Sequence, residues 1–239
     1  MFLELIEVEI FRNLESNVRC GHDLNILVGL NGQGKTNWLE AINILATTRS
    51  FKTSRLSEAV RFGEEMAIIR GRVGRTEDIH RDLQAVIQGN SKSFFVNGKR
   101  EPVNNYLSQL HTVVFNADEL EVVRGHPDAR RRFLDQAIVS IHPPYVQTLA
   151  DYSRVIKQKN ALLQAEQDEK ISQEKAAEQL EPWNEQLITH GTRIHRSRLR
   201  YVERLNEVLE NNLFGTEQIV MRYASSLEGK GDLSDYESL

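Results

Sequence analysis

Cysteine is almost absent from the chain, and other absences narrow the possibilities further. Cys20 is the single cysteine among 239 residues, so no disulfide framework can form and a cytoplasmic protein is expected. No apolar run approaches the roughly 18 residues of a membrane-spanning helix. Residues 1–7 carry acids and no basic leader, unlike a secretion signal. The seven histidines lack metal-ligand spacing, and no Ser–His–Asp arrangement is readable, so no catalytic residue is assigned in this chain.

A strong excess of positive charge is also absent. The 30 lysines and arginines against 34 acids leave a net charge of −4. This balance argues against coating nucleic acid by bulk charge, although it allows a local basic patch. Hydrophobic residues make up 40% and charged residues 27%, which is ordinary for a globular protein. The pattern changes near residue 120, so we expect two lobes, residues 1–120 and 121–239.

The first lobe mixes strand patterns with one helix pattern. An amphipathic helix is predicted over residues 35–47, with Leu39, Ile42 and Leu45 on its apolar face. Turn residues at Gly89–Asn90 and Asn97–Gly98 suggest antiparallel hairpins. The predicted strands are residues 2–10, 24–28, 66–73, 83–87, 94–96 and 112–115, of which 24–28 is a short apolar run typical of a buried strand.

The second lobe reads as a helical arm. Pro127 occupies a first helical position, and apolar residues then recur at helical spacing until Pro143–Pro144 ends the pattern. A second helix is predicted from about Tyr145 and a third from near Pro182. Two long consecutive helices of this kind are expected to pack antiparallel.

The most specific motif is Gly-Leu-Asn-Gly-Gln-Gly-Lys-Thr, which fits the phosphate-loop pattern G-x-x-x-x-G-K-[ST]. Glycines let successive N–H groups converge on an anion, and the following helix N-terminus adds partial positive charge. The lysine can reach the β- and γ-phosphates, and the threonine hydroxyl can ligate Mg²⁺. The predicted nucleotide-binding residues are Gly29, Leu30, Asn31, Gly32, Gln33, Gly34, Lys35 and Thr36, with Thr36 also on the metal.

The loop alone leaves the nucleotide and the chemistry open. A guanine-reading Asn-Lys-x-Asp is absent, which leaves ATP as the default. Hydrolysis also needs an acid at the end of a second buried strand, and the acids Asp118 and Glu119 come too late after residues 113–115. A phosphate-loop phosphotransferase acting on a small acceptor, and an interaction fragment that has lost hydrolysis, remain alternatives.

Two arginine clusters are candidates for contacts with DNA or a partner. Arg193, Arg196, Arg200 and Arg204 are spaced by three, four and four residues, so they form one stripe on a helix. The stripe could neutralise DNA phosphates, or it could be a solvated face with intrahelical ion pairs.

The second cluster is Arg130, Arg131 and Arg132, near a predicted helix start, where cations oppose the macrodipole. A contact with DNA, with phosphate or with a second protomer would explain it. Pairs with Asp128 and Asp135 on the same helix would also explain it.

Seven segments carry a further signal, in this order along the chain: Phe11-Arg12-Asn13 and residues 29–42, 49–53, 96–98, 125–135, 152–163 and 183–187. In these segments the chain resembles the RecF family, the SMC-like ABC ATPases of bacterial recombinational repair. The resemblance implies an α/β phosphate-loop NTPase head of the ABC/SMC type, with an antiparallel β layer and a helical arm lobe.

The resemblance also implies a function. It implies binding of ATP with Mg²⁺, ATP-dependent homodimers on duplex or gapped DNA, and loading of recombinase with RecO- and RecR-type partners in replication restart and the SOS response. It implies that Arg12 approaches the nucleotide. The family's signature segment and acidic Mg²⁺ strand lie toward the C-terminus and find no match here. The chain is therefore expected to lack part of each ATP site, and whether it hydrolyses ATP stays open.

Overall fold

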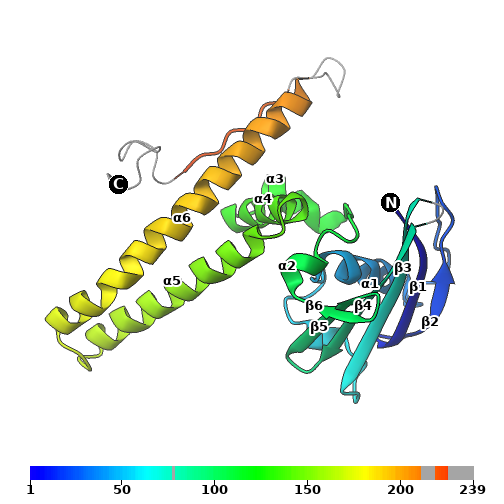
Figure 1. The fold of residues 1–239 in the computed structure, drawn as a ribbon, viewed down its shortest axis with the longest axis horizontal. Helices are drawn as coiled ribbons and strands as arrows, with labels where there is room; N and C mark the ends of the chain where they lie inside the picture. Colours follow the sequence, from blue (N-terminus) through cyan, green and yellow to red (C-terminus); the bar gives the residue numbers. More distant parts are fainter. Residues whose placement is uncertain (77–78, 211–218, 226–239) are drawn as a thin grey trace. The chain divides into compact units, whose positions relative to one another are not determined.

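The computed structural model describes residues 1–239 except 77–78, 211–218 and 226–239 (Figure 1). The chain divides into two compact units, Met1–Leu120 and Glu121–Leu239. We call them the sheet unit and the helical unit and describe each by itself.

A six-stranded antiparallel sheet forms the framework of the sheet unit, in the order β2-β1-β3-β4-β5-β6. Asn97 and Gly98 both have positive φ angles, 50° and 77°, as the predicted two-residue hairpin turn requires. The strands predicted at residues 2–10, 66–73, 83–87 and 94–96 are confirmed, whereas β2 and β6 were not predicted. The strands are β1 (Phe2–Phe11), β2 (Leu14–Arg19), β3 (Met66–Thr76), β4 (Ile79–Gln88), β5 (Ser91–Val96) and β6 (Lys99–Glu101).

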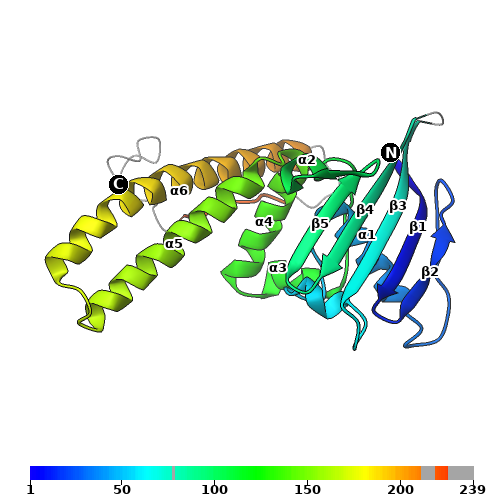
Figure 2. The same ribbon diagram turned by 60° about the horizontal axis from the view of Figure 1, so that its bottom comes forward.

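One helix, α1 (Lys35–Thr47), packs against a single face of the sheet and lies behind β3 and β4 in Figure 2. A Cβ atom at Gly71 would lie 2.4 Å from Leu45 Cδ2, so glycine allows this close approach. The short α2 (Val103–Tyr106) closes the core, where the buried Tyr106 hydroxyl donates to Leu45 O at 2.7 Å. Buried core residues include Ile6, Val8, Phe11, Ala41, Ile44, Leu45, Ala67, Ile69, Val73, Leu83, Ala85 and Ile87.

The predicted helix is confirmed, but its predicted apolar face is wrong in part. Leu39 is 53% exposed, whereas Glu40 is fully buried. The reason is that Glu40 has polar partners inside the unit, described below, so its burial does not leave an unpaired charge.

Two predicted strands, residues 24–28 and 112–115, are not strands in the described part of the chain. Val28 is 89% exposed, so the burial expected for residues 24–28 is also wrong, and Val113 in the second segment is 99% exposed. A strand needs neighbours that satisfy its N–H and C=O groups and a layer that covers its side chains. The described strands and α1 supply neither to these two segments.

The helical unit contains α3 (Glu121–Arg124), α4 (Pro127–Ile141), α5 (Tyr145–Gln167) and α6 (Gln173–Leu209). The helix starts predicted at Pro127 and Tyr145 are confirmed, and α5 and α6 run side by side as a long hairpin (Figures 1 and 2). The start predicted near Pro182 is wrong, because Ser172 Oγ caps α6 by accepting from Lys175 N at 3.3 Å. Two short 3₁₀ turns, Leu56–Ala59 and Ala117–Leu120, belong to the sheet unit.

An ion pair ties α4 to α6 beside the apolar core of the helical unit. Asp135 accepts two hydrogen bonds of 2.8 Å from Arg198 and a third of 2.8 Å from the Tyr145 hydroxyl. Tyr145 also packs with Ile138 and Ile194 in that core. None of the described helices is long and apolar enough to cross a lipid bilayer.

Candidate functional site

The predicted phosphate loop forms an exposed turn that leads directly into α1. Gly32 and Gly34 have φ angles of 82° and 92°, the left-handed region that glycine adopts without strain. No side chain caps the start of α1 at Lys35. No side chain therefore takes the N–H groups that precede Asn37 at the start of the helix, and the helix dipole favours negative charge there.

The Lys35 side chain folds back over this loop. Its Nζ donates to Gly29 O and to Leu30 O, both at 2.8 Å. The Gln33 side chain closes the same turn, because its Oε1 accepts from Leu30 N at 2.8 Å. A phosphate oxygen would be a stronger partner for the ammonium than these neutral carbonyls, because its negative charge adds a Coulomb attraction to the hydrogen bond. The loop and its lysine therefore fit the triphosphate of a nucleotide.

Thr36 follows in the first turn of α1 and is exposed. A threonine hydroxyl at this position of a phosphate loop can be one ligand of Mg²⁺, with phosphate oxygens as others. No group of three or more His, Cys, Asp or Glu side chains comes together among the described residues. The donor set thus fits Mg²⁺ carried by a nucleotide.

The turn between β1 and β2 lies beside the phosphate loop and contacts it directly. Asn13 Nδ2 donates to Gly32 O at 3.1 Å, and Asn13 Oδ1 accepts from Asn37 Nδ2 of α1 at 2.7 Å. A Cβ atom at Gly34 would lie 2.6 Å from Leu14 Cδ2, so only glycine leaves room for this contact. Asn13 is not among the residues predicted for the site from sequence, although it lies in the segment Phe11-Arg12-Asn13 that resembles the family.

Arg12 belongs to the same turn and contacts α1 at Glu40. Its Nε and Nη2 donate to the two carboxylate oxygens of Glu40 at 3.1 and 2.8 Å, and its Nη1 donates to Glu58 O at 2.6 Å. Ser50 Oγ donates to the same carboxylate at 2.6 Å, and Lys52 Nζ lies 3.8 Å from it. The guanidinium of Arg12, whose side chain is 24% exposed, therefore forms an ion pair with a fully buried acid. Glu40 is not among the site residues predicted from sequence.

The cluster of Arg130, Arg131 and Arg132 is exposed, and part of it serves local structure. Arg130 Nη1 donates to Gly125 O at 3.0 Å, just after α3. Arg131 pairs with Asp128, and this hydrogen bond lowers the pKa of the Asp128 carboxyl. The expected pair with Asp128 is thus present.

The stripe on α6 differs, because its four guanidinium groups share one exposed face. Arg193, Arg196, Arg200 and Arg204 are all exposed, whereas Ile194 and Val202 on the same helix are buried. Arg198 lies outside the stripe and is held by Asp135.

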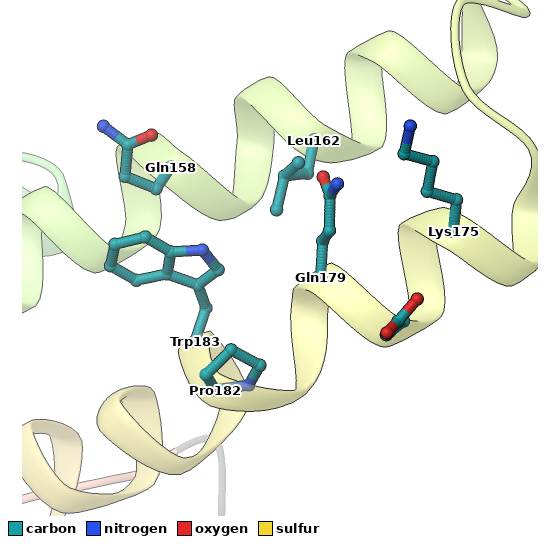
Figure 3. Close-up of a pocket in the computed structure, with 7 residues that line it drawn as sticks. Gln158, Leu162, Lys175, Gln179, Pro182 and Trp183 are labelled. Atoms are coloured by element: carbon teal, nitrogen blue, oxygen red, sulfur yellow. The ribbon is translucent and has the colours of Figure 1, made fainter.

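A pocket of about 480 Å³ lies between α5 and α6, where Figure 3 shows Trp183 and Leu162 above Pro182. Pro182 lies inside α6 and has no N–H to donate to the carbonyl four residues earlier. None of the nucleotide-site or arginine candidates lines this pocket. The lining residues are Gln158, Leu162, Lys175, Glu178, Gln179, Pro182 and Trp183.

Comparison with known proteins gives a consistent family. No protein-family model matches the chain. The DNA replication and repair protein RecF of Geotalea uraniireducens (strain Rf4) is 36% identical over 243 residues, covering 99% of this chain and 63% of that protein. RecF of Ligilactobacillus salivarius (strain UCC118) is 35% identical over 252 residues, covering 100% and 64%.

A solved structure of the recombination mediator protein RecF-ATPrS in the RecFOR pathway aligns with a TM-score of 0.88 and 30% identity. The alignment covers 99% of this chain and 64% of that one. The expected fold, a phosphate-loop ATPase of the ABC/SMC-like type with an antiparallel sheet and helices, is thereby confirmed. The chain spans slightly less than two thirds of the length of the relatives it matches.

Proposed function

Because the chain belongs to the RecF family, we propose that it binds ATP and DNA in bacterial recombinational repair and replication. The observation that carries this proposal is the phosphate loop, with left-handed glycines at 32 and 34 and an uncapped helix N-terminus directly behind it. The relatives are named for DNA replication and repair, which favours this function over a phosphotransferase.

In the proposed complex the loop N–H groups and the start of α1 hold the phosphates of ATP. Lys35 exchanges its bonds to Gly29 O and Leu30 O for phosphate oxygens. Mg²⁺, when bound, neutralises phosphate charge, and Thr36 supplies its protein ligand. Arg12 lies in the turn beside the loop, which supports a contact with the nucleotide. Its ion pair with Glu40 holds the guanidinium in place next to α1.

DNA contact is assigned first to the stripe on α6. Four arginines on one exposed helix face present a row of cations without a base-reading geometry, which suits phosphate contacts. The Arg130–Arg132 cluster is the second candidate, because three consecutive residues of a helix point in different directions and do not form a row.

The activity of the whole protein is part of the proposal as well. We propose that the whole protein forms ATP-dependent dimers on duplex or gapped DNA in the cytoplasm and hydrolyses ATP weakly. The RecFOR pathway named for the solved RecF structure supports RecO- and RecR-type partners. We also propose that the exposed apolar segments 24–28 and 112–115 pair with strands of a further portion of the protein, equivalent to the part of the relatives that this chain does not span. Strand pairing would satisfy their main-chain N–H and C=O groups, and a layer packed on the resulting sheet would remove their side chains from water.

Titration with ATPγS and Mg²⁺, followed calorimetrically, tests the nucleotide site. We expect Lys35→Ala to abolish measurable binding, while Lys99→Ala, an exposed lysine on β6, leaves the affinity unchanged. Equal affinity of the wild type and Lys35→Ala, or no binding by the wild type, would refute the assignment of the loop.

The dependence of duplex DNA binding on salt tests the α6 stripe. Each lost phosphate contact lowers the slope of log K against log salt concentration by about 0.9. Arg193→Gln with Arg200→Gln should therefore reduce the slope by about 2. A control double variant, Arg124→Gln with Arg154→Gln, removes the same charge elsewhere on the helical unit, and an equal reduction in that control would exclude the stripe.

A further inference from the structure

The turn between β1 and β2 is fixed by contacts that do not involve the phosphate loop. Arg12 N donates to Ala59 O at 2.8 Å, and Phe11 forms a bridge with Val60. Arg61 then donates from Nε to Arg12 O at 3.3 Å and from Nη2 to Leu14 O at 3.2 Å. The residues on both sides of Asn13 are therefore held by the segment 59–61, so its carboxamide projects from a fixed support.

From this support the Asn13 carboxamide joins the phosphate loop to α1. It donates to Gly32 O at 3.1 Å and accepts from Asn37 Nδ2 at 2.7 Å. Asn37 in turn accepts from Lys52 Nζ. Both the Nδ2 and the Oδ1 of Asn13 therefore form hydrogen bonds, and the partner of Nδ2 is a main-chain carbonyl of the loop.

That one carbonyl determines where the next N–H group points. In a trans peptide the carbonyl and the following N–H lie on opposite sides of the C–N bond. Because Asn13 holds Gly32 O, the Gln33 N–H points the other way, toward Leu30 O at 3.4 Å. Gly32 has no side chain and a φ of 82°, so steric clashes do not resist rotation of this peptide. Besides the Asn13 bond, the long Gln33 N–H bond to Leu30 O is the contact that a rotation would break.

We propose that Asn13 is a positioning residue of the nucleotide site, which prevents the Gly32–Gln33 peptide from flipping. A flip would replace the Gln33 N–H donor with the Gly32 carbonyl oxygen and so oppose an anion in the loop. The relevance to ATP rests on the proposed function of the loop. The orientation of the peptide does not, so it can be tested separately.

Two variants of Asn13 separate its bonds. Asn13→Ala removes both, whereas Asn13→Asp keeps an acceptor for Asn37 but places a carboxylate against Gly32 O. Asn17→Ala, an exposed asparagine on β2, is the matched control. Loss of one hydrogen bond of ordinary strength corresponds to about a three- to tenfold change in an equilibrium constant. We therefore expect ATPγS to bind about three- to tenfold more weakly to Asn13→Ala, and more weakly still to Asn13→Asp.

Relaxation of the Gln33 amide ¹⁵N, measured without nucleotide, is the second readout. The order parameter reports ps–ns motion, with about 0.85 for a rigid backbone and less than about 0.6 for a flexible one, and relaxation dispersion reports μs–ms exchange. We expect a lower order parameter or new dispersion at Gln33 in both Asn13 variants and no change in Asn17→Ala. Unchanged values of both in Asn13→Ala overturn the proposal even if the wild type binds no nucleotide. Absence of ATPγS binding by the wild type, together with changed relaxation at Gln33, refutes the proposed nucleotide site and leaves the positioning role supported.

Discussion

Replacing Glu40 with glutamine removes one charge from the centre of the sheet unit without changing the size of the side chain. The carboxylate is fully buried and accepts hydrogen bonds from Arg12 at 2.8 and 3.1 Å and from Ser50 at 2.6 Å. In Glu40→Gln the guanidinium of Arg12 faces a neutral amide whose nitrogen cannot accept its N–H groups. The variant should fold less stably while its secondary structure remains the same.

The size of the effect follows from burial. Breaking a buried ion pair by removing one partner costs about 3–5 kcal/mol, because the other charge is left desolvated. Arg12 is 24% exposed, so water can replace part of what it loses. We therefore expect Glu40→Gln to lower the free energy of unfolding of the sheet unit by about 2–3 kcal/mol. With a urea m-value of about 2 kcal/mol/M, the midpoint should fall by more than about 1 M.

Trp38, two residues before Glu40 on α1, provides the local signal for this measurement. Trp183 is the second tryptophan and lies on α6, so a Trp183→Phe background confines the fluorescence change to the sheet unit. Urea unfolding is then compared between this background, Glu40→Gln and the control Glu65→Gln, which changes an exposed acid of the same unit. The control should leave the midpoint unchanged.

A double-mutant cycle separates the ion pair from other contacts of Glu40. Arg12→Met alone should destabilise the unit by about 3 kcal/mol, since it leaves the carboxylate buried without its main partner. Arg12→Met with Glu40→Gln should cost clearly less than the sum of the two single changes. Additive effects, or a change below about 0.5 kcal/mol for Glu40→Gln, would show that the buried pair does not hold the turn to α1.

Three further changes test other parts of the molecule. Gly34→Ala should cost more unfolding free energy than Gly32→Ala in urea titrations, because both have positive φ but only the first Cβ would collide with a side chain; equal costs would contradict this steric account. Asp135→Asn should destabilise the helical unit by about 2–4 kcal/mol in thermal or urea unfolding, far more than Asp128→Asn, whose partner is exposed. Burial and the neighbouring carboxylate raise the Tyr145 pKa above its ordinary value of about 10, so the folded state holds the proton more tightly, and stability should fall as the pH rises above about 10. Tyr145→Phe should make that alkaline loss smaller, and an unchanged pH profile would refute the assignment.

Much of the architecture could be predicted from the sequence, because the signals were local. Hairpin turns at Gly89–Asn90 and Asn97–Gly98 marked neighbouring strands, and prolines at 127 and 143–144 marked where α4 begins and ends. Turn and cap preferences depend on a few adjacent residues, so they survive without knowledge of the rest of the fold.

Two predictions from sequence were wrong, one about the burial of a segment and one about the start of a helix. Residues 24–28 are as apolar as a buried strand, yet Val28 is 89% exposed. Proline favours first helical positions and so predicts a helix start near Pro182, but the Ser172 cap begins α6 earlier. The first error reflects the lack of a covering layer over residues 24–28, which depends on the rest of the fold, whereas the second reflects a local cap at Ser172.

The sequence by itself determined the phosphate-loop motif, since its eight residues are contiguous and their chemistry depends on their order. Only the tertiary structure decided what surrounds that loop. Asn13 and Gly32 are 19 residues apart, and Arg12 and Glu40 are 28 apart. The burial of Glu40 and the orientation of the Asn13 carboxamide arise when the sheet brings such distant residues together. The reason is that desolvation and hydrogen-bond geometry depend on all the groups around an atom in space and not only on its neighbours in sequence.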